Sequence, residues 1–140
     1  MKRATLLILA LLLVSCGEKT KPLESVKSAI TVEMSPDEDF RAVPDTIKMG
    51  TLDQGDIYNG EFTVRNIGEK PLVILSIITG CGCTTTSYDT KPIPPGEDRT
   101  ISFSFDSKGR MGLQFKTIDL VTNQSLGASV ILTGEIGPKK

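Results

Sequence analysis

The chain has 140 residues, of which 39% are hydrophobic, 24% are charged and 5% are aromatic, and it contains neither histidine nor tryptophan. A chain of this length is expected to form one folded domain of ordinary size. Its formal charge of -1 argues against nucleic-acid binding, which requires a basic patch. The absence of histidine excludes Ser-His and Cys-His nucleophiles and every zinc site that needs imidazole. The composition therefore favours a globular protein that is not an enzyme.

The first residues have the features of a secretory signal helix. Lys2 and Arg3 precede residues 4–14, which are apolar except for Thr5. A helix of eleven residues rises only about 16 Å, too short for a hydrocarbon core of roughly 30 Å. The basic start and the short apolar segment predict a signal peptide at residues 1–15.

The end of this segment predicts a lipid anchor. Leu13-Val14-Ser15-Cys16 resembles the bacterial lipobox, in which the cysteine is acylated and becomes the first residue of the mature protein. The resemblance implies a covalent lipid on Cys16 and attachment to a membrane of the bacterial cell envelope, on the periplasmic side or at the cell surface. The alternative is an ordinary signal peptide followed by a chance cysteine. Export would place the two remaining cysteines, Cys81 and Cys83, where disulfides form.

Residues 16–44 are expected to form a flexible tether between the anchor and the folded domain. Prolines interrupt this segment, and it shows no sustained hydrophobic period. A short extended piece at residues 29–34 remains compatible with the pattern. The acidic residues 37–39 lack the ligand spacing of an EF-hand calcium loop and are interpreted as a solvated cluster.

From Asp45 onward the sequence predicts short strands joined by turns. The expected strands lie at residues 46–49, 61–65, 72–78, 84–88, 101–105, 113–122 and 126–133. The run at 72–78 is apolar on both faces, which favours a strand buried inside the sandwich. Pro94-Pro95-Gly96-Glu97 has the composition of a type II turn, and Asn66-Ile67-Gly68 is a second turn signal.

About seven strands spaced near ten residues apart predict an all-β fold, an immunoglobulin-like antiparallel β-sandwich at residues 45–136. Residues 137–140 are expected to form a C-terminal tail.

Most aromatic side chains are expected in the core of this sandwich. Those at strand spacing are Phe62, Phe103, Phe105 and Phe115. Ser104 lies between two of them and is expected to face solvent. Tyr58 and Tyr88 are interpreted as core or interface residues, with a sugar-binding surface as the alternative.

Cys81-Gly82-Cys83 is the only candidate for chemistry. A regular strand would hold the two Cα atoms about 6.6 Å apart, with Cβ atoms too distant for a disulfide, so bonding requires a bend at Gly82. A disulfide that closes a three-residue ring removes little conformational entropy from the unfolded chain and therefore contributes little stability. Three interpretations remain open: an inert pair at a bulge, a thiol-disulfide site, and a Cu(I) site with Met49 or Met111 as a further soft ligand.

The order of several short motifs resembles one bacterial family. They are Asn66-x-Gly68, Pro71-Leu72-x-Ile74, Cys81-Gly82-Cys83-Thr84, Pro92-Ile93-x-Pro95-Gly96-Glu97, Thr122-Asn123 and Thr133-Gly134. The family is catalogued as "domain of unknown function 1573", and the resemblance covers residues 45–136. It implies an immunoglobulin-like sandwich similar to major sperm protein and Hydin-type domains, exported and often lipid-anchored. It brings no established activity, and no agreed role for its hallmark positions Cys81, Gly82 and Cys83.

These features favour a non-catalytic, lipid-anchored binding or scaffold module of the cell envelope. Its partner is expected to be an unknown envelope protein or glycan, reached by strand addition or loop contact, and not a nucleic acid. The alternative is a thiol redox or Cu(I)-binding protein that uses Cys81 and Cys83. Apart from the lipid on Cys16, and Cu(I) in that alternative, no cofactor is expected.

Overall fold

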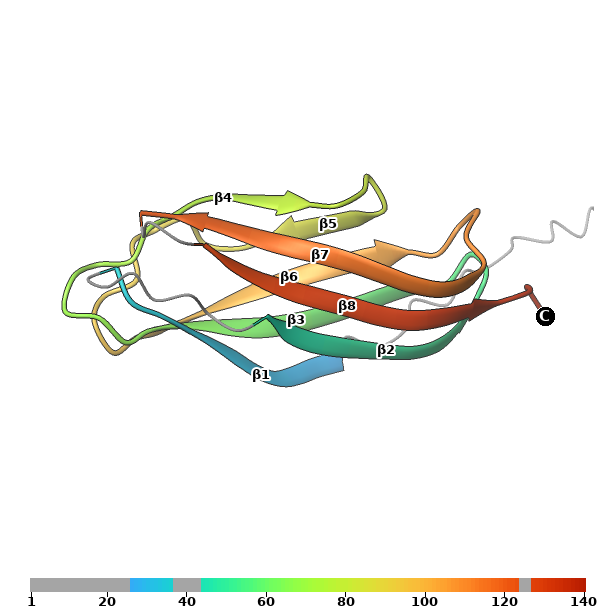
Figure 1. Ribbon diagram of the computed structural model, residues 1–140, viewed down its shortest axis with the longest axis horizontal. Helices are drawn as coiled ribbons and strands as arrows, with labels where there is room; N and C mark the ends of the chain where they lie inside the picture. Colours follow the sequence, from blue (N-terminus) through green and yellow to red (C-terminus); the bar gives the residue numbers. More distant parts are fainter. Residues whose placement is uncertain (1–25, 37–43, 124–126) are drawn as a thin grey trace, which may run out of the picture.

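The computed structural model describes residues 26–36, 44–123 and 127–140. Eight strands in these ranges form two sheets that pack face to face (Figure 1). The strands are β1 Val26–Met34, β2 Asp45–Asp53, β3 Ile57–Asn66, β4 Ile74–Thr79, β5 Thr84–Ser87, β6 Asp98–Asp106, β7 Gly112–Thr122 and β8 Ala128–Gly137. The expected all-β sandwich is confirmed. The predicted signal helix at residues 1–15 and the predicted lipid site Cys16 lie outside the described residues.

The order of the strands places the sheet edges in two pairs. One sheet has the order β1-β3-β6-β5, and the other has the order β2-β8-β7-β4. β1 and β2 therefore run along one side of the sandwich and β4 and β5 along the opposite side (Figure 1).

The expected number and direction of strands need correction. The described residues contain eight strands and not seven, and both sheets are mixed, because β1–β3 and β2–β8 are parallel pairs. The remaining pairs are antiparallel. Period-two alternation shows which face of a strand is buried but is the same for both directions, so it could not reveal the parallel pairs.

β1 lies inside the range predicted as a tether. It pairs with β3 from Val26 opposite Gly60 to Met34 opposite Asn66. Val32 and Met34 are buried in the core, and Ile30 packs against it. Residues 29–34, where the pattern was compatible with a short extended piece, are thus part of a longer strand that forms one edge of the sandwich.

The core follows the predicted alternation in β6. Ile101, Phe103 and Phe105 are buried, while Ser102 and Ser104 are partly exposed on the outer face. The Phe103 ring lies 6.0 Å from the Tyr58 ring and 6.4 Å from the Phe62 ring, measured between centroids. β6 therefore supplies the centre of the aromatic core.

Two predictions about buried positions are wrong. Phe115 is 68% exposed, because β7 directs Ile118 and Leu120 inward and alternation turns position 115 outward. The run at 72–78 does not form a central strand, since β4 is an edge strand whose Leu75 and Ile78 are 62% and 55% exposed. A run that is apolar on both faces does not distinguish a central strand from an edge with an uncovered face.

The predicted type II turn is confirmed. Glu97 donates its backbone N–H to the Pro94 carbonyl at 3.1 Å, and Gly96 has φ of +77° at the position that requires a positive value. Residues 123–125, which separate the last two predicted strands, lie mostly outside the described ranges, because these omit residues 124–126.

The face assignment of β6 predicts a contrast between two neighbouring substitutions. Phe103→Ala removes a ring that is only 3% exposed and should lower the free energy of unfolding by about 3–5 kcal/mol. Ser104→Ala on the outer face should change it by no more than about 0.5 kcal/mol. Denaturant titration of both variants measures the difference, and equal effects would show that the face assignment is incorrect.

Candidate functional site

The cysteine pair lies where the chain crosses between the sheets. Residues 80–83 connect β4 of one sheet to β5 of the other, on the same side of the sandwich. Cys81 and Cys83 form a disulfide with their Cα atoms 5.2 Å apart. That separation is shorter than the roughly 6.6 Å of a regular strand, so the chain bends at Gly82. Gly82 is exposed, and no heavy atom lies within 4 Å of the position a Cβ would take.

Hydrogen bonds from three strands hold this connection. The Cys81 carbonyl accepts the Thr79 hydroxyl at 3.2 Å and the Thr84 N–H at 3.4 Å. The Cys83 carbonyl accepts the Asp106 N–H from β6 at 2.8 Å. The backbone of the connection is thereby tied to β4, β5 and β6.

The two sulfur atoms differ in their surroundings. Cys83 and Thr84 are buried, while Cys81 is partly buried. The Thr84 hydroxyl oxygen lies 3.9 Å from each sulfur. An external thiolate would therefore reach Cys81 more easily than Cys83.

Disulfide sulfurs are not thiolates, so metal binding by this pair would first require its reduction. Met49 is buried on β2, at the opposite edge of its sheet from β4, and packs near Gly134. Met111 is exposed in the β6–β7 connection. In the three described ranges, no group of three His, Cys, Asp or Glu residues is close enough to hold a metal ion.

Most of the other motif residues have structural roles. The Asn66 side chain is fully buried, donates to the carbonyls of Lys70 and Ile93 at 2.8 Å and 2.9 Å, and accepts the Gly68 N–H at 2.9 Å. Neither Asn66 nor Gly68 has positive φ, so the side-chain amide and not a left-handed backbone makes this turn. Leu72 and Ile93 exchange two backbone hydrogen bonds beside it.

Asn123 acts similarly at the end of β7. Its side chain donates to the Pro71 carbonyl at 3.1 Å and accepts the Val73 N–H at 2.9 Å. The sequence singled out both asparagines as part of a motif or turn, but gave no signal for these roles.

Two ion pairs lie on the surface around the proline-rich turn. Arg65 donates to Asp98 at 2.7 Å and holds the pKa of that carboxyl below its ordinary value. Arg99 contacts Asp89 at 2.7 Å, but the Lys91 N–H is the main reason that the pKa of Asp89 is also lowered. Exposed pairs of this kind contribute little to stability and create no reactive group.

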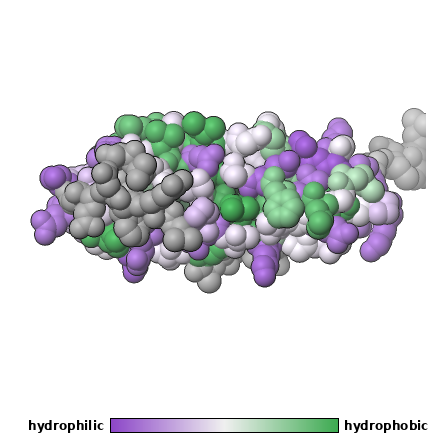
Figure 2. All heavy atoms as spheres, in the orientation of Figure 1, coloured by the Kyte–Doolittle hydropathy of each residue, from purple (hydrophilic) through white to green (hydrophobic). Residues whose placement is uncertain are grey.

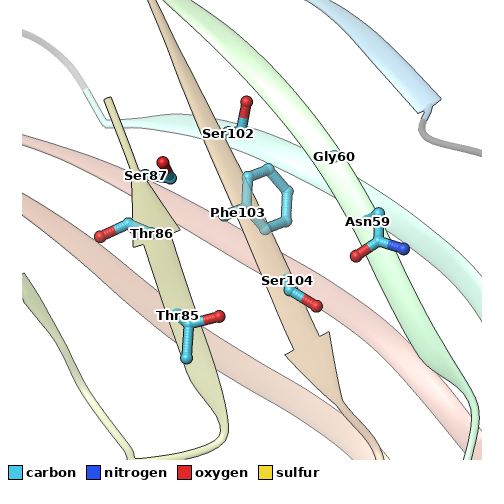
Figure 3. Close-up of a pocket in the computed structure, with 8 residues that line it drawn as sticks. All are labelled: Asn59, Gly60, Thr85, Thr86, Ser87, Ser102, Phe103 and Ser104. Carbon is cyan, nitrogen blue, oxygen red and sulfur yellow. The ribbon is translucent and has the colours of Figure 1, made fainter. Parts of the chain in front are cut away.

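A shallow hollow of about 210 Å³ lies on the sheet that contains β3, β6 and β5 (Figure 3). Small polar side chains surround it, among them Asn59, Thr85 and Ser102, and the Phe103 ring lies beside Gly60. None of the lining residues is charged or able to act as a general base near neutral pH. The hollow therefore offers hydroxyl groups for hydrogen bonding but no activated nucleophile.

The opposite sheet carries exposed hydrophobic side chains. In Figure 2 this nearer sheet shows hydrophobic side chains along β4 and again over β7 and β8. The exposed residues are Leu75, Ile78 and Val121 near the β4 edge, with Leu113 and Phe115 at the start of β7. Beside Phe115 lies a second hollow, of about 290 Å³, with Lys48 and Glu135 among its lining residues.

The tyrosines do not form a joint surface. Tyr58 is buried, and this burial raises the pKa of its hydroxyl. Tyr88 is partly buried and packs against the core. The part of the chain that the structure describes contains no helix long and apolar enough to cross a membrane.

The two mixed sheets, their buried interface and the cysteine-bearing crossing define an all-β domain of the immunoglobulin-like sandwich class. The chain belongs to the family described as "Protein of unknown function (DUF1573)", whose family model matches residues 40–136. The resemblance inferred from the short motifs is thereby confirmed. No curated protein matches the chain.

Solved structures share the fold. A protein of unknown function from Porphyromonas gingivalis W83 superposes with a TM-score of 0.58 and 21% identity, over 66% of this chain and 44% of that one. The VesB protease of Vibrio cholerae gives 0.56 and 12%, over 66% and 30%. The secreted serine protease VesC of the same organism gives 0.51 and 10%, over 64% and 21%. This chain thus spans less than half of each, and at these identities the likeness shows the fold alone.

The disulfide should contribute only modestly to stability. In the chain-entropy model a three-residue loop contributes about 1.6 kcal/mol, so reduction by dithiothreitol should lower the free energy of unfolding by about that amount. Denaturant titrations with and without reductant, with free thiols counted in each, measure it. A loss of about 3 kcal/mol or more, the value for a fifteen-residue loop, would contradict this estimate.

Proposed function

We propose that this protein is a lipid-anchored, non-catalytic binding module of the bacterial cell envelope. Its partner is a polypeptide that adds an extended segment to the β4 edge. The observation that carries the proposal is an edge strand with exposed hydrophobic side chains and no charged residue.

The backbone of β4 has a free hydrogen-bonding side. β4 pairs with β7 alone among the described strands. Gly80 donates its N–H to the Thr117 carbonyl, so the alternation of an antiparallel ladder directs the backbone groups of Ile77 and Thr79 away from β7. A strand laid along this side would satisfy them, while Leu75 and Ile78 would contact its side chains. Backbone pairing of this kind selects a polypeptide over a glycan.

The other three edges have features that discourage such pairing. β2 contains Asp45, Lys48 and Asp53 with a register irregularity between Lys48 and Gly50, and β1 contains Glu33. β5 has only four residues. Charges, irregularities and short length are the usual protections of edge strands. β4, with the sequence Ile-Leu-Ser-Ile-Ile-Thr, contains neither charge nor proline, and its register irregularity, between Ile74 and Ser76, leaves Ser76–Thr79 in regular pairing with β7.

The order of the strands supports an anchor and a binding edge on opposite sides. The chain enters the sandwich at β1, and β4 lies on the side away from β1 and β2 (Figure 1). A partner at β4 would therefore not compete with the segment that leads to Cys16.

Acylation at Cys16 is tested by one substitution. Cys16→Ser removes the only thiol in the lipobox-like sequence, so the protein should be released from membranes or remain unprocessed. Membrane fractionation and the mass of the mature N-terminus measure the outcome. Unchanged membrane partition, with a mature chain that begins elsewhere, would contradict the anchor.

Strand addition is tested by placing a charge on the edge. Ile78→Lys puts an ammonium group opposite Asp119 on β7, a favourable cross-strand pair that should preserve folding. The variant should lower partner affinity by about tenfold or more, which is about 1.4 kcal/mol. Capture from detergent-solubilised envelope with mass spectrometry identifies the partner, and its titration gives the affinity.

Thr85→Lys supplies the matched control. It introduces the same charge at an exposed position of β5, the neighbouring edge on the same side. This variant should bind as the unmodified chain does. Equal binding by both variants, or equal loss, would show that β4 does not pair with the partner.

The alternative function, thiol redox exchange or Cu(I) binding at Cys81 and Cys83, draws support from one observation. The two sulfurs are bonded to each other, and the space around Gly82 is open to an approaching thiol. Both activities need the pair to be reducible in the folded protein. A pair that remains oxidised in excess glutathione would contradict this alternative.

A further inference from the structure

The hydrophobic residues at the start of β7 belong to one end of the sandwich. This end, the loop end, is formed by the β2–β3 and β6–β7 connections and the end of β8. Gln54 donates its N–H to the Gly137 carbonyl at 3.0 Å and its side-chain amide to the Arg110 carbonyl at 3.1 Å. Ser107 donates to the Asp53 carbonyl at 2.9 Å. These hydrogen bonds link the β2–β3 connection both to the β6–β7 connection and to the end of β8.

The first described strand starts near this end. β3 begins at the loop end with Ile57, and β1 runs parallel to β3. Val26, the first residue of β1, pairs with Gly60, only three residues into β3, or about 10 Å along the strand. β1 therefore starts nearer to the loop end than to the opposite end of the sandwich.

The length of that chain limits how far the loop end can be from a membrane. Val26 follows Cys16 by ten residues, which span at most about 36 Å when fully extended. An acyl chain on Cys16 would thus hold the start of β1 within about 36 Å of the bilayer surface, a distance at which the loop end can contact the bilayer.

The loop end exposes hydrophobic side chains of the kind that contact a bilayer. Leu113 and Phe115 are 72% and 68% exposed, and Met111 and Ile57 are also exposed at this end. Hydrophobic groups of this size lie favourably at the boundary between headgroups and acyl chains. The chain segments at this end carry charges of both signs in similar number: Lys108, Arg110, Lys139 and Lys140 against Asp53, Asp56, Asp106 and Glu135, with Lys48 and Glu135 lining the hollow beside Phe115.

We infer that the loop end docks on the lipid bilayer, with Met111, Leu113 and Phe115 inserted at the headgroup boundary. This inference rests on the proposed lipid anchor at Cys16. Because charge is nearly balanced, apolar contact and not attraction to anionic lipid drives the docking. The β4 edge then lies away from the membrane contact, where a partner can reach it.

The absence of tryptophan from the sequence provides a specific probe. Phe115→Trp introduces a single indole at an exposed position, and Leu75→Trp places the same indole at the far end of the same face. The acylated full-length variants are reconstituted into vesicles that contain lipids brominated near the carbonyl end of the acyl chains. Vesicles of phosphatidylethanolamine with phosphatidylglycerol are compared with vesicles of phosphatidylcholine alone.

The expected result is quenching and a blue shift of the indole in Phe115→Trp, to a similar extent in both vesicles, and neither effect in Leu75→Trp. Adding Leu113→Glu to Phe115→Trp should remove most of the quenching while the protein still floats with the vesicles. Because Leu113 is largely exposed, this change leaves the core intact.

Three other outcomes overturn the inference. Equal quenching of both variants would mean that the chain lies flat and does not dock by its loop end. A floating protein without quenching of Phe115→Trp would reject docking while the anchor stands, as expected if another protein covers the patch. A chain that neither carries a lipid by mass spectrometry nor floats would reject the anchor, and the docking with it.

Discussion

One buried amide group holds together the end of the sandwich away from the loop end. The Asn66 side chain satisfies the carbonyls of Lys70 and Ile93 and the N–H of Gly68, three backbone groups from two separate connections. The backbone of Asn66 adds hydrogen bonds to Glu97 and Gly96 of the proline turn. A buried backbone group left without a partner costs about 1–3 kcal/mol, so no apolar residue could replace Asn66 without a large loss. The start of β4 and the approach to β6 both depend on this amide.

The sequence was informative wherever burial alternates along a strand. The pattern of Ile101, Phe103 and Phe105 identified the inner face of β6, and Pro94 to Glu97 identified the turn before it, because both signals are local. Strand direction and edge position were not recoverable, since neither changes the period of the pattern. The face on which Phe115 lies was predicted incorrectly. Alternation from the buried Ile118 places position 115 on the outer face, whereas the hydrophobicity of Phe115 alone favours burial.

The candidate site was recoverable only in part for a related reason. Cys81 and Cys83 were conspicuous because of their type and spacing, and the need for a bend at Gly82 followed from strand geometry. What the sequence could not show is that the bend lies at the crossing between two sheet edges. There, Thr79, Thr84 and Asp106 hold the backbone of the connection. The disulfide therefore lies in the bend that directly follows β4, next to the proposed binding edge.

The arrangement of edges gives the proposed function a geometric basis. Three steps of about 4.8 Å separate β2 from β4 across the sheet, so the proposed binding edge has a fixed position relative to the side of the sandwich where β1 and β2 lie. A domain attached only by a flexible segment would present β4 in every direction, and most orientations would be unproductive. Contact between the loop end and the bilayer would remove much of this rotational freedom, which raises the effective concentration of the edge toward a partner in the same membrane. Under these proposals the two sets of exposed hydrophobic residues have different roles: those at the loop end would orient the domain, and those on β4 would contact the partner.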